Sequence, residues 1–213
     1  MNRIIIHWTA GGNKANATDK RHYHIIVEGD GNIAYGNHPF SANDPIRHPN
    51  DSSTYAAHTR GANTKAIGIA MAGMRGAKER PFDHGPSPIT KVQVAALVEE
   101  VSILCRIHGI PVTRETVLTH AEVQSTLGIA QRNKWDVMWL PGMAAAGDAH
   151  KIGDHLRERI AVSASNKSAL HTTPPPVARP APVVVQKPVQ SERQGWLVRI
   201  LELLASLIKG KRT

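Results

Sequence analysis

The sequence predicts a mixed α/β domain over residues 1–160, a linker over 161–194 and a short amphipathic helix over 195–213. Three observations support this division. Short β-branched runs alternate with longer stretches of helical periodicity up to residue 160. After Val162 the chain becomes rich in serine, alanine and proline, which is typical of an extended linker. The last segment then turns apolar again and ends in basic residues.

Four stretches of the domain have the character of β-strands. Residues 3–7 ("RIIIH") form a β-branched run, expected to be buried with its histidine emerging at an edge. Residues 22–36 hold two strand-like runs around "EGDG", whose Asp-Gly pair favours a hairpin. Residues 65–73 ("KAIGIAMAG") are typical of a central strand, and residues 115–120 ("ETVLTH") predict a short strand that ends in a histidine.

A long helix is predicted between the last two strands. Thr90 and Gln93 form a T-x-x-Q capping box at its start, and Gly109 is a natural C-terminal stop. Apolar residues recur at helical spacing, so that one face should pack on the sheet; they are Val94, Leu97, Val98, Val101, Leu104 and Cys105.

A second helix is predicted to begin at Asp148, with apolar residues at four-residue steps from Ile152 to Ile160. The single cysteine, Cys105, excludes an internal disulfide and a cysteine-rich zinc module. Because it lies in the apolar pattern of the first helix, we interpret it as a buried small side chain and not as a nucleophile.

The net charge of +9 is unevenly distributed. From Ala161 onward, eight Lys or Arg and two Asp or Glu residues give +6, and the first 160 residues carry the remaining +3. A nearly neutral domain without a basic, aromatic-rich patch argues against nucleic acid as a partner. A basic C-terminal region instead favours an anionic surface.

The first residues, "MNRIIIHWTAGG", do not resemble a secretory signal peptide, because the apolar run is too short. No stretch of about 20 apolar residues predicts a transmembrane helix. We therefore expect the protein to be made and first kept in the cytoplasm.

Two histidines, His7 and His120, lie at the ends of predicted strands, where their side chains can project into a shared cleft. Together with the carboxylate of Asp136 they would form a three-ligand zinc set that leaves a fourth tetrahedral position open for water. Lys134 lies two residues before Asp136 in "RNKWD", a spacing that suits an irregular loop better than a helix. A cation there would stabilise an oxyanion; the alternative is a solvated surface lysine.

Four segments, in order, resemble the zinc-dependent N-acetylmuramoyl-L-alanine amidases of the phage-lysozyme and peptidoglycan-recognition superfamily. They are "IIIHWTAGG", "HYHIIVEGDGNI", "AAHTRGANTKAIGIAMAG" and "VLTHAEVQ…RNKWD", and the resemblance covers roughly residues 1–142. It implies a central mixed β-sheet flanked by helices. It also implies hydrolysis of the amide bond between N-acetylmuramic acid and L-alanine in peptidoglycan.

The resemblance assigns a role to individual residues. His7, His120 and Asp136 match the zinc ligands, and Lys134 matches the catalytic lysine of a K-x-D motif. Tyr23 matches a tyrosine that assists the attacking water. With an ordinary phenol pKa near 10, we expect it to position water unless zinc or the lysine lowers that value.

Two further residues match positions around this site. His58 matches a position in the substrate cleft, and Glu122 matches a residue that orients the loop. His22 and His24, on either side of Tyr23, are expected to be structural or to support the site from behind. Without the family resemblance, the favoured interpretation of Tyr23 is an ordinary strand tyrosine packed against the hairpin.

Residues 195–213 form an apolar segment with a narrow polar stripe at Arg199, Glu202, Ser206 and Lys209. Fourteen helical residues span roughly 21 Å, too short for a bilayer core of about 30 Å. We expect this helix to lie on an anionic membrane or lipopolysaccharide surface. Self-association and docking on the domain are the alternatives.

These features favour a phage endolysin that lyses a Gram-negative host from within. One alternative is a cytosolic amidase that recycles cell-wall fragments, which would need no membrane-active segment. Another is a module that binds peptidoglycan without cutting it, which would not need a complete ligand set.

Overall fold

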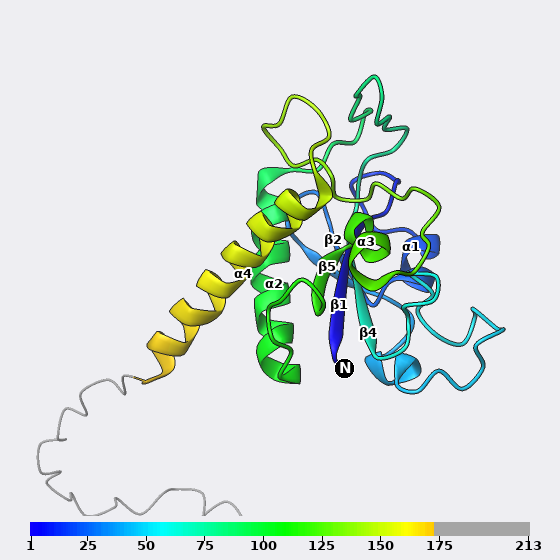
Figure 1. Ribbon diagram of the computed structural model, residues 1–213, viewed down its shortest axis with the longest axis vertical. Helices are drawn as coiled ribbons and strands as arrows, with labels where there is room; N and C mark the ends of the chain where they lie inside the picture. Colours follow the sequence, from blue (N-terminus) through cyan, green and yellow to red (C-terminus); the bar gives the residue numbers. More distant parts are fainter. Residues whose placement is uncertain (173–213) are drawn as a thin grey trace, which may run out of the picture. The chain divides into compact units, whose positions relative to one another are not determined.

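The structure, a computed structural model, describes residues 1–172, and its strands form a mixed five-stranded sheet (Figure 1). The strands are β1 (Arg3–Trp8), β2 (Ile25–Val27), β3 (Ile33–Tyr35), β4 (Ala66–Met71) and β5 (Val117–Thr119). They lie in the order β3-β2-β4-β1-β5. β1 is parallel to β4 and β5, β2 is parallel to β4, and β3 is antiparallel to β2. The predicted fold class, a mixed sheet flanked by helices, is confirmed.

Helices cover both faces of this sheet. They are α1 (Ala17–His22), α2 (Lys91–His108), α3 (Val123–Leu127) and α4 (Ala149–Thr172), with 3-10 turns η1 (Phe40–Asn43) and η2 (His120–Glu122). α2 and α4 pack side by side against one face, whereas α1 and α3 lie on the other side (Figure 1). Among the described residues, no helix has the length and apolarity needed to cross a membrane.

The alternation of side chains along β1 divides the core between the two faces. Ile4, Ile6 and Trp8 belong to the main cluster under α2 and α4, whereas Ile5 packs with Val123 of α3 on the opposite face. His7 follows the parity of Ile5. It therefore points to the face that carries α1 and α3.

The position expected for His7 needs one correction. β1 extends one residue further, to Trp8, and lies between β4 and β5, so it is an inner strand. His7 is completely buried instead of emerging at an edge. The β-branched run "RIIIH" predicts burial but does not reveal that both neighbours of the strand are occupied.

The predicted hairpin and first long helix are confirmed. β2 and β3 pair across the turn that contains Asp30 and Gly31. α2 begins after the Thr90 capping box and ends at Gly109, which has the left-handed φ of 63°. Cys105 is buried, and burial raises the pKa of its thiol to about 11, which excludes a thiolate nucleophile at neutral pH.

α1 and α3 are absent from the sequence-based assignment because helices of six and five residues are too short to show a periodic pattern. α1 is instead stabilised by a capping box in which the Asn16 side chain accepts from the backbone N–H groups of Thr18 and Asp19. Tyr23 follows directly as the C-cap of α1. The alternative of an ordinary strand tyrosine in the hairpin is therefore wrong.

α4 begins at Ala149, next to the predicted start at Asp148, and it buries Ile152, Leu156 and Ile160 as expected. It continues to Thr172, beyond the boundary placed at residue 160. Residues 161–172 contain neither proline nor glycine, so their serine and alanine content is compatible with a helix. The rest of the predicted linker and the helix predicted over 195–213 lie outside the described residues.

Candidate functional site

The parallel pairing of β1 with β5 brings the two candidate histidine ligands together. Ile6 of β1 lies opposite Thr119 of β5, so the residues that follow, His7 and His120, are neighbours at the same end of the sheet. His120 opens the η2 turn directly after β5. Asp136 reaches the same place from the loop between α3 and α4, and the backbone carbonyl of Asp136 accepts a hydrogen bond from Ala121 of η2.

The three side chains converge on one point. The Nδ1 atoms of His7 and His120 are 3.0 Å apart. Oδ2 of Asp136 is 3.0 Å from Nδ1 of His120 and 3.5 Å from Nδ1 of His7. All three residues are buried, and their potential ligand atoms lie within 4.8 Å of one another, a grouping that could hold a metal ion.

The outward nitrogen of His120 is fixed by Gln131. Nε2 of His120 is 2.9 Å from Oε1 of the buried Gln131 side chain. The amide nitrogen of Gln131 donates to the backbone carbonyls of Arg60 (2.9 Å) and Ile129 (3.3 Å), so its oxygen must face the histidine. His120 therefore carries its proton on Nε2, and its Nδ1 lone pair is directed to the cluster.

The outward nitrogen of His7 has comparable partners. Nε2 of His7 lies 3.2 Å from Oγ1 of Thr59 and 3.3 Å from Nδ1 of His58. Burial, followed by the neighbouring His120, lowers the pKa of His7 to about 4. The imidazole is therefore neutral at pH 7, which is the state required of a metal ligand.

Asp136 provides the negative charge of the cluster. Burial raises the pKa of its carboxyl, but the neighbouring imidazoles of His120 and His7 outweigh this effect and hold the pKa well below its usual range. The carboxylate is therefore ionised at neutral pH. A buried anion beside two imidazole rings is an electrostatic arrangement that favours a cation.

The segment "RNKWD" has an irregular backbone, as its spacing predicts. Arg132, Asn133 and Val137 all have positive φ values, of 53°, 56° and 69°. Left-handed backbone is uncommon for residues other than glycine and concentrates at functional sites. Here it turns Asp136 inward to the cluster while Lys134 remains exposed.

A cavity of about 340 Å³ opens above the cluster. Its lining includes five of the six site residues predicted from the sequence: Tyr23, His58, His120, Lys134 and Asp136. His7, the sixth, lies behind the lining, with its ring centroid 5.2 Å from that of Tyr23. The chain thus brings all six together.

Tyr23 keeps its proton in this setting. Burial, with a smaller contribution from the charge of Asp136, raises the pKa of the phenol far above its usual value. At neutral pH Tyr23 is a hydrogen-bond donor in the cavity wall. A protonated phenol does not abstract a proton from water, and its expected role in positioning water stays a prediction.

His58 is buried between the cavity and the sheet. Gly68 of β4 gives it room, because a Cβ atom at this position would lie 2.4 Å from Cγ of the His58 ring. Burial, together with the neighbouring His7 and His24, keeps the pKa of His58 well below its usual range. A neutral His58 therefore contacts both the cavity and His7.

His24 has a structural role, as expected. Its Nε2 atom lies 3.2 Å from Oδ1 of Asn43, and its Nδ1 atom accepts the backbone N–H of Gly68. His22 lies in the cavity lining. The two histidines beside Tyr23 therefore have different environments.

Sequence reasoning missed several contributors to the site. Gln131 and Thr59 contact the outward nitrogens of the two histidines, and Arg60 and Arg132 add positive charge to the cavity lining. Thr59 and Arg60 fall inside "AAHTRGANT" and Arg132 opens "RNKWD", which are parts of the segments on which the family resemblance rests. Gln131 lies outside them and carries no local signal, because its role depends on contacts across the fold.

A family model described as N-acetylmuramoyl-L-alanine amidase matches residues 1–142 of the chain. This range contains the three residues of the cluster and all of the cavity lining. A comparison with curated proteins found no match.

Proposed function

Because the chain belongs to the N-acetylmuramoyl-L-alanine amidase family, whose model covers two thirds of it, we propose that it is a zinc-dependent amidase acting as a phage endolysin. Family membership makes it a hydrolase of the amide bond between N-acetylmuramic acid and L-alanine, with peptidoglycan as substrate. The observation that carries the metal dependence is the convergence of His7, His120 and Asp136 beneath the cavity.

The donor set fits zinc. Two imidazoles and one carboxylate are common catalytic zinc ligands, and three protein ligands leave a position open for chemistry. Both imidazoles direct Nδ1 to the same point while their outward nitrogens contact Gln131 and Thr59. When bound, zinc would supply an activated water and polarise the amide carbonyl.

The residues around the cluster then act on the substrate. Lys134, exposed in the cavity lining, supplies a cation that stabilises the negative charge developing on the carbonyl oxygen. Tyr23 holds a protonated phenol in the cavity, which orients the attacking water and donates toward the departing amine of L-alanine. His58 forms part of the wall against which the substrate binds.

The decisive experiment combines metal analysis with hydrolysis of purified sacculi. The protein should contain about one zinc ion per chain and release free amino groups of L-alanine. A chelator should abolish this release, and added zinc should restore it. Activity that survives complete metal removal would contradict the proposed zinc dependence.

The endolysin role rests on the C-terminal sequence. Residues 195–213 combine an apolar pattern with terminal basic residues, which suits an anionic membrane or lipopolysaccharide surface. We assign the enzyme to the host cytoplasm before its release to the cell wall. An endolysin should cleave intact sacculi at least as well as soluble muropeptides, whereas a recycling amidase should prefer the soluble fragments.

Deletion of residues 195–213 tests the surface-binding role separately. The truncated protein should bind anionic liposomes less tightly and retain activity on purified sacculi. Liposome binding equal to that of the full chain would contradict this role and leave the amidase assignment intact.

A further inference from the structure

Glu122 holds the backbone next to the metal-site histidine. Its side chain is completely buried, two residues after His120. Oε2 of Glu122 accepts the backbone N–H of Thr119, the residue directly before His120, at 2.8 Å. The carboxylate thereby fixes the end of β5 and the start of the η2 turn, which together set the position of the imidazole.

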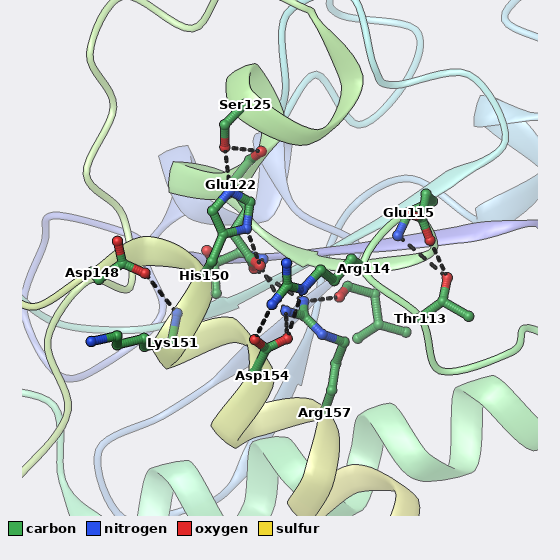
Figure 2. A network of polar contacts seen from close by, with 12 residues as sticks. Thr113, Arg114, Glu115, Glu122, Ser125, Asp148, His150, Lys151, Asp154 and Arg157 are labelled. Carbon is green, nitrogen blue, oxygen red and sulfur yellow. Dashed lines mark hydrogen bonds and ion pairs between the residues drawn. The ribbon is translucent and has the colours of Figure 1, made fainter.

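Arg157 of α4 compensates this buried charge. Its two terminal nitrogens lie 2.8 Å and 3.2 Å from the two carboxylate oxygens of Glu122, a bidentate arrangement (Figure 2). The same guanidinium donates to the backbone carbonyl of Val117, the first residue of β5, at 2.8 Å. Arg157 therefore contacts β5 at its start and, through Glu122, at its end.

The pair extends to the surface through a second carboxylate. Asp154, one turn earlier in α4, accepts from Arg157 at 2.7 Å and also pairs with Arg114 (Figure 2). Arg157 is almost completely buried, whereas the side chains of Arg114 and Asp154 are about half exposed. Of the two arginines, only Arg157 touches the carboxylate of Glu122.

The close approach of α4 to Glu122 depends on Gly153. A Cβ atom at this position would lie 2.1 Å from Oε2 and 2.3 Å from Cδ of Glu122. These distances are far inside van der Waals contact, so a larger residue would displace either the carboxylate or the helix. α4 therefore meets Glu122 in two ways: its backbone packs against the carboxylate at Gly153, and its Arg157 side chain pairs with it.

A buried ion pair is weak evidence for a contribution to stability, because desolvation opposes the attraction between the charges. The position of this ion pair is more informative about its role than its contribution to stability. Two opposite charges are almost completely withdrawn from water beside the strand that positions His120. Groups that orient metal ligands from behind have measurable effects on metal affinity.

We propose that Arg157 is a positioning residue of the metal site, acting through Glu122 on the backbone that carries His120. α4 is then part of the metal-binding unit although it lies beyond residues 1–142, which the family model matches. The inference rests on the proposed function, because it requires that the cluster binds a metal ion.

The test measures zinc affinity in full-length variants. Arg157→Met should weaken zinc binding about 10- to 100-fold in competition with a chromophoric chelator, the range typical of supporting residues. It should also alter the visible absorption of the cobalt-substituted protein, which reports ligand geometry. With saturating zinc, kcat should fall more than KM changes. Arg157→Lys, which keeps the charge without the bidentate geometry, should recover part of each loss.

Arg114→Met is the matched control. It removes an arginine from the same network without touching Glu122, so zinc affinity and the cobalt spectrum should remain within about twofold of the wild type. A folded Arg157→Met variant with wild-type affinity and spectrum would overturn the proposal. If that variant does not fold, wild-type values in Arg157→Lys would overturn it equally. A wild-type chain that binds no metal would overturn the proposed function itself, and this inference with it.

Discussion

Two regions of the molecule meet at the candidate metal centre, and they hold their side chains by different means. On the sheet side, His7 belongs to a strand paired on both edges, and His120 follows the end of a neighbouring strand. On the loop side, Lys134 and Asp136 lie in irregular backbone with several left-handed residues. Regular hydrogen bonding thus fixes the backbone that carries the two imidazoles, whereas the carboxylate and the cation depend on tertiary contacts of the loop.

Consecutive residues of the loop nevertheless contact consecutive residues of β1. Trp135 stacks edge-to-face on Trp8, with ring centroids 4.8 Å apart, while the next residue, Asp136, contacts His7. Two consecutive loop residues therefore meet two consecutive strand residues on opposite faces of β1. Adjacent side chains of the loop thus contact both faces of β1 and set the position of Asp136 relative to His7.

The largest expected effect is loss of a ligand from either side. His7→Ala on the sheet side and Asp136→Ala on the loop side should both reduce zinc content to background and abolish hydrolysis of sacculi. Both residues are needed because two remaining ligands cannot hold zinc in a catalytic geometry. Elemental analysis and release of L-alanine amino groups check this. If Asp136→Ala alone retained zinc and activity, the loop would not supply a ligand.

Replacement of Lys134 in the loop should lower the catalytic rate without affecting zinc binding. Lys134→Ala should retain zinc but lose about 10²- to 10³-fold in kcat, the usual cost of removing an oxyanion-stabilising group. Lys134→Arg should recover part of this rate. Lys151→Ala, an exposed lysine of α4, serves as the control and should show wild-type kinetics. Wild-type turnover of Lys134→Ala would reduce Lys134 to a surface residue.

Acidification should lower the free energy of unfolding through buried histidines at a pH at which Asp136 of the loop is still ionised. Burial lowers the pKa values of His7 and His24 to about 4 from an ordinary value of 6.5. The unfolded chain then binds protons that the folded chain does not, so stability is fully present above about pH 6.5 and is lost as the pH falls toward 4. Each histidine contributes roughly 3 kcal/mol across this range. The pKa of Asp136 is lowered, so its carboxylate stays ionised there.

Urea unfolding of the metal-free protein at several pH values between 7 and 4 measures this slope. His24→Gln should flatten the dependence, because it removes one of the buried titrating histidines without touching the cluster. His48→Gln, at an exposed histidine, should leave the slope unchanged. Equal slopes for wild type and His24→Gln would show that burial of His24 does not govern acid stability.

The regular half of the structure could be predicted from the sequence. β-branched runs marked β1 and β5, a capping box and a terminal glycine marked α2, and an Asp-Gly turn marked the β2–β3 hairpin. These signals are local, so they do not require knowledge of the fold. The continuation of α4 to Thr172 was missed because serine and alanine occur in linkers and in helices.

The site could be predicted only in part, and for a related reason. His7, His120 and Asp136 were found because residue type, strand ends and a family resemblance coincide at these positions. Gln131 and Arg157 were not found, since a glutamine or an arginine becomes a supporting residue only through distant contacts. Gln131 reaches His120 and the backbone of Arg60, 71 positions away along the chain, and nothing in the segment "GIAQRN" reveals either contact.

Replacement of Gln131 is expected to have the smallest effect. It tests how the loop and the sheet cooperate, because Gln131 belongs to the loop but orients His120 at the end of a strand. Gln131→Leu removes the acceptor from Nε2 of His120, so the imidazole loses its fixed tautomer and zinc affinity should fall about 10- to 100-fold. Gln131→Glu keeps an acceptor oxygen at that position and should restore most of the affinity. Chelator competition measures both variants. If Gln131→Leu bound zinc as tightly as the wild type, the strand end alone would orient His120, and the loop would contribute only Asp136 and Lys134.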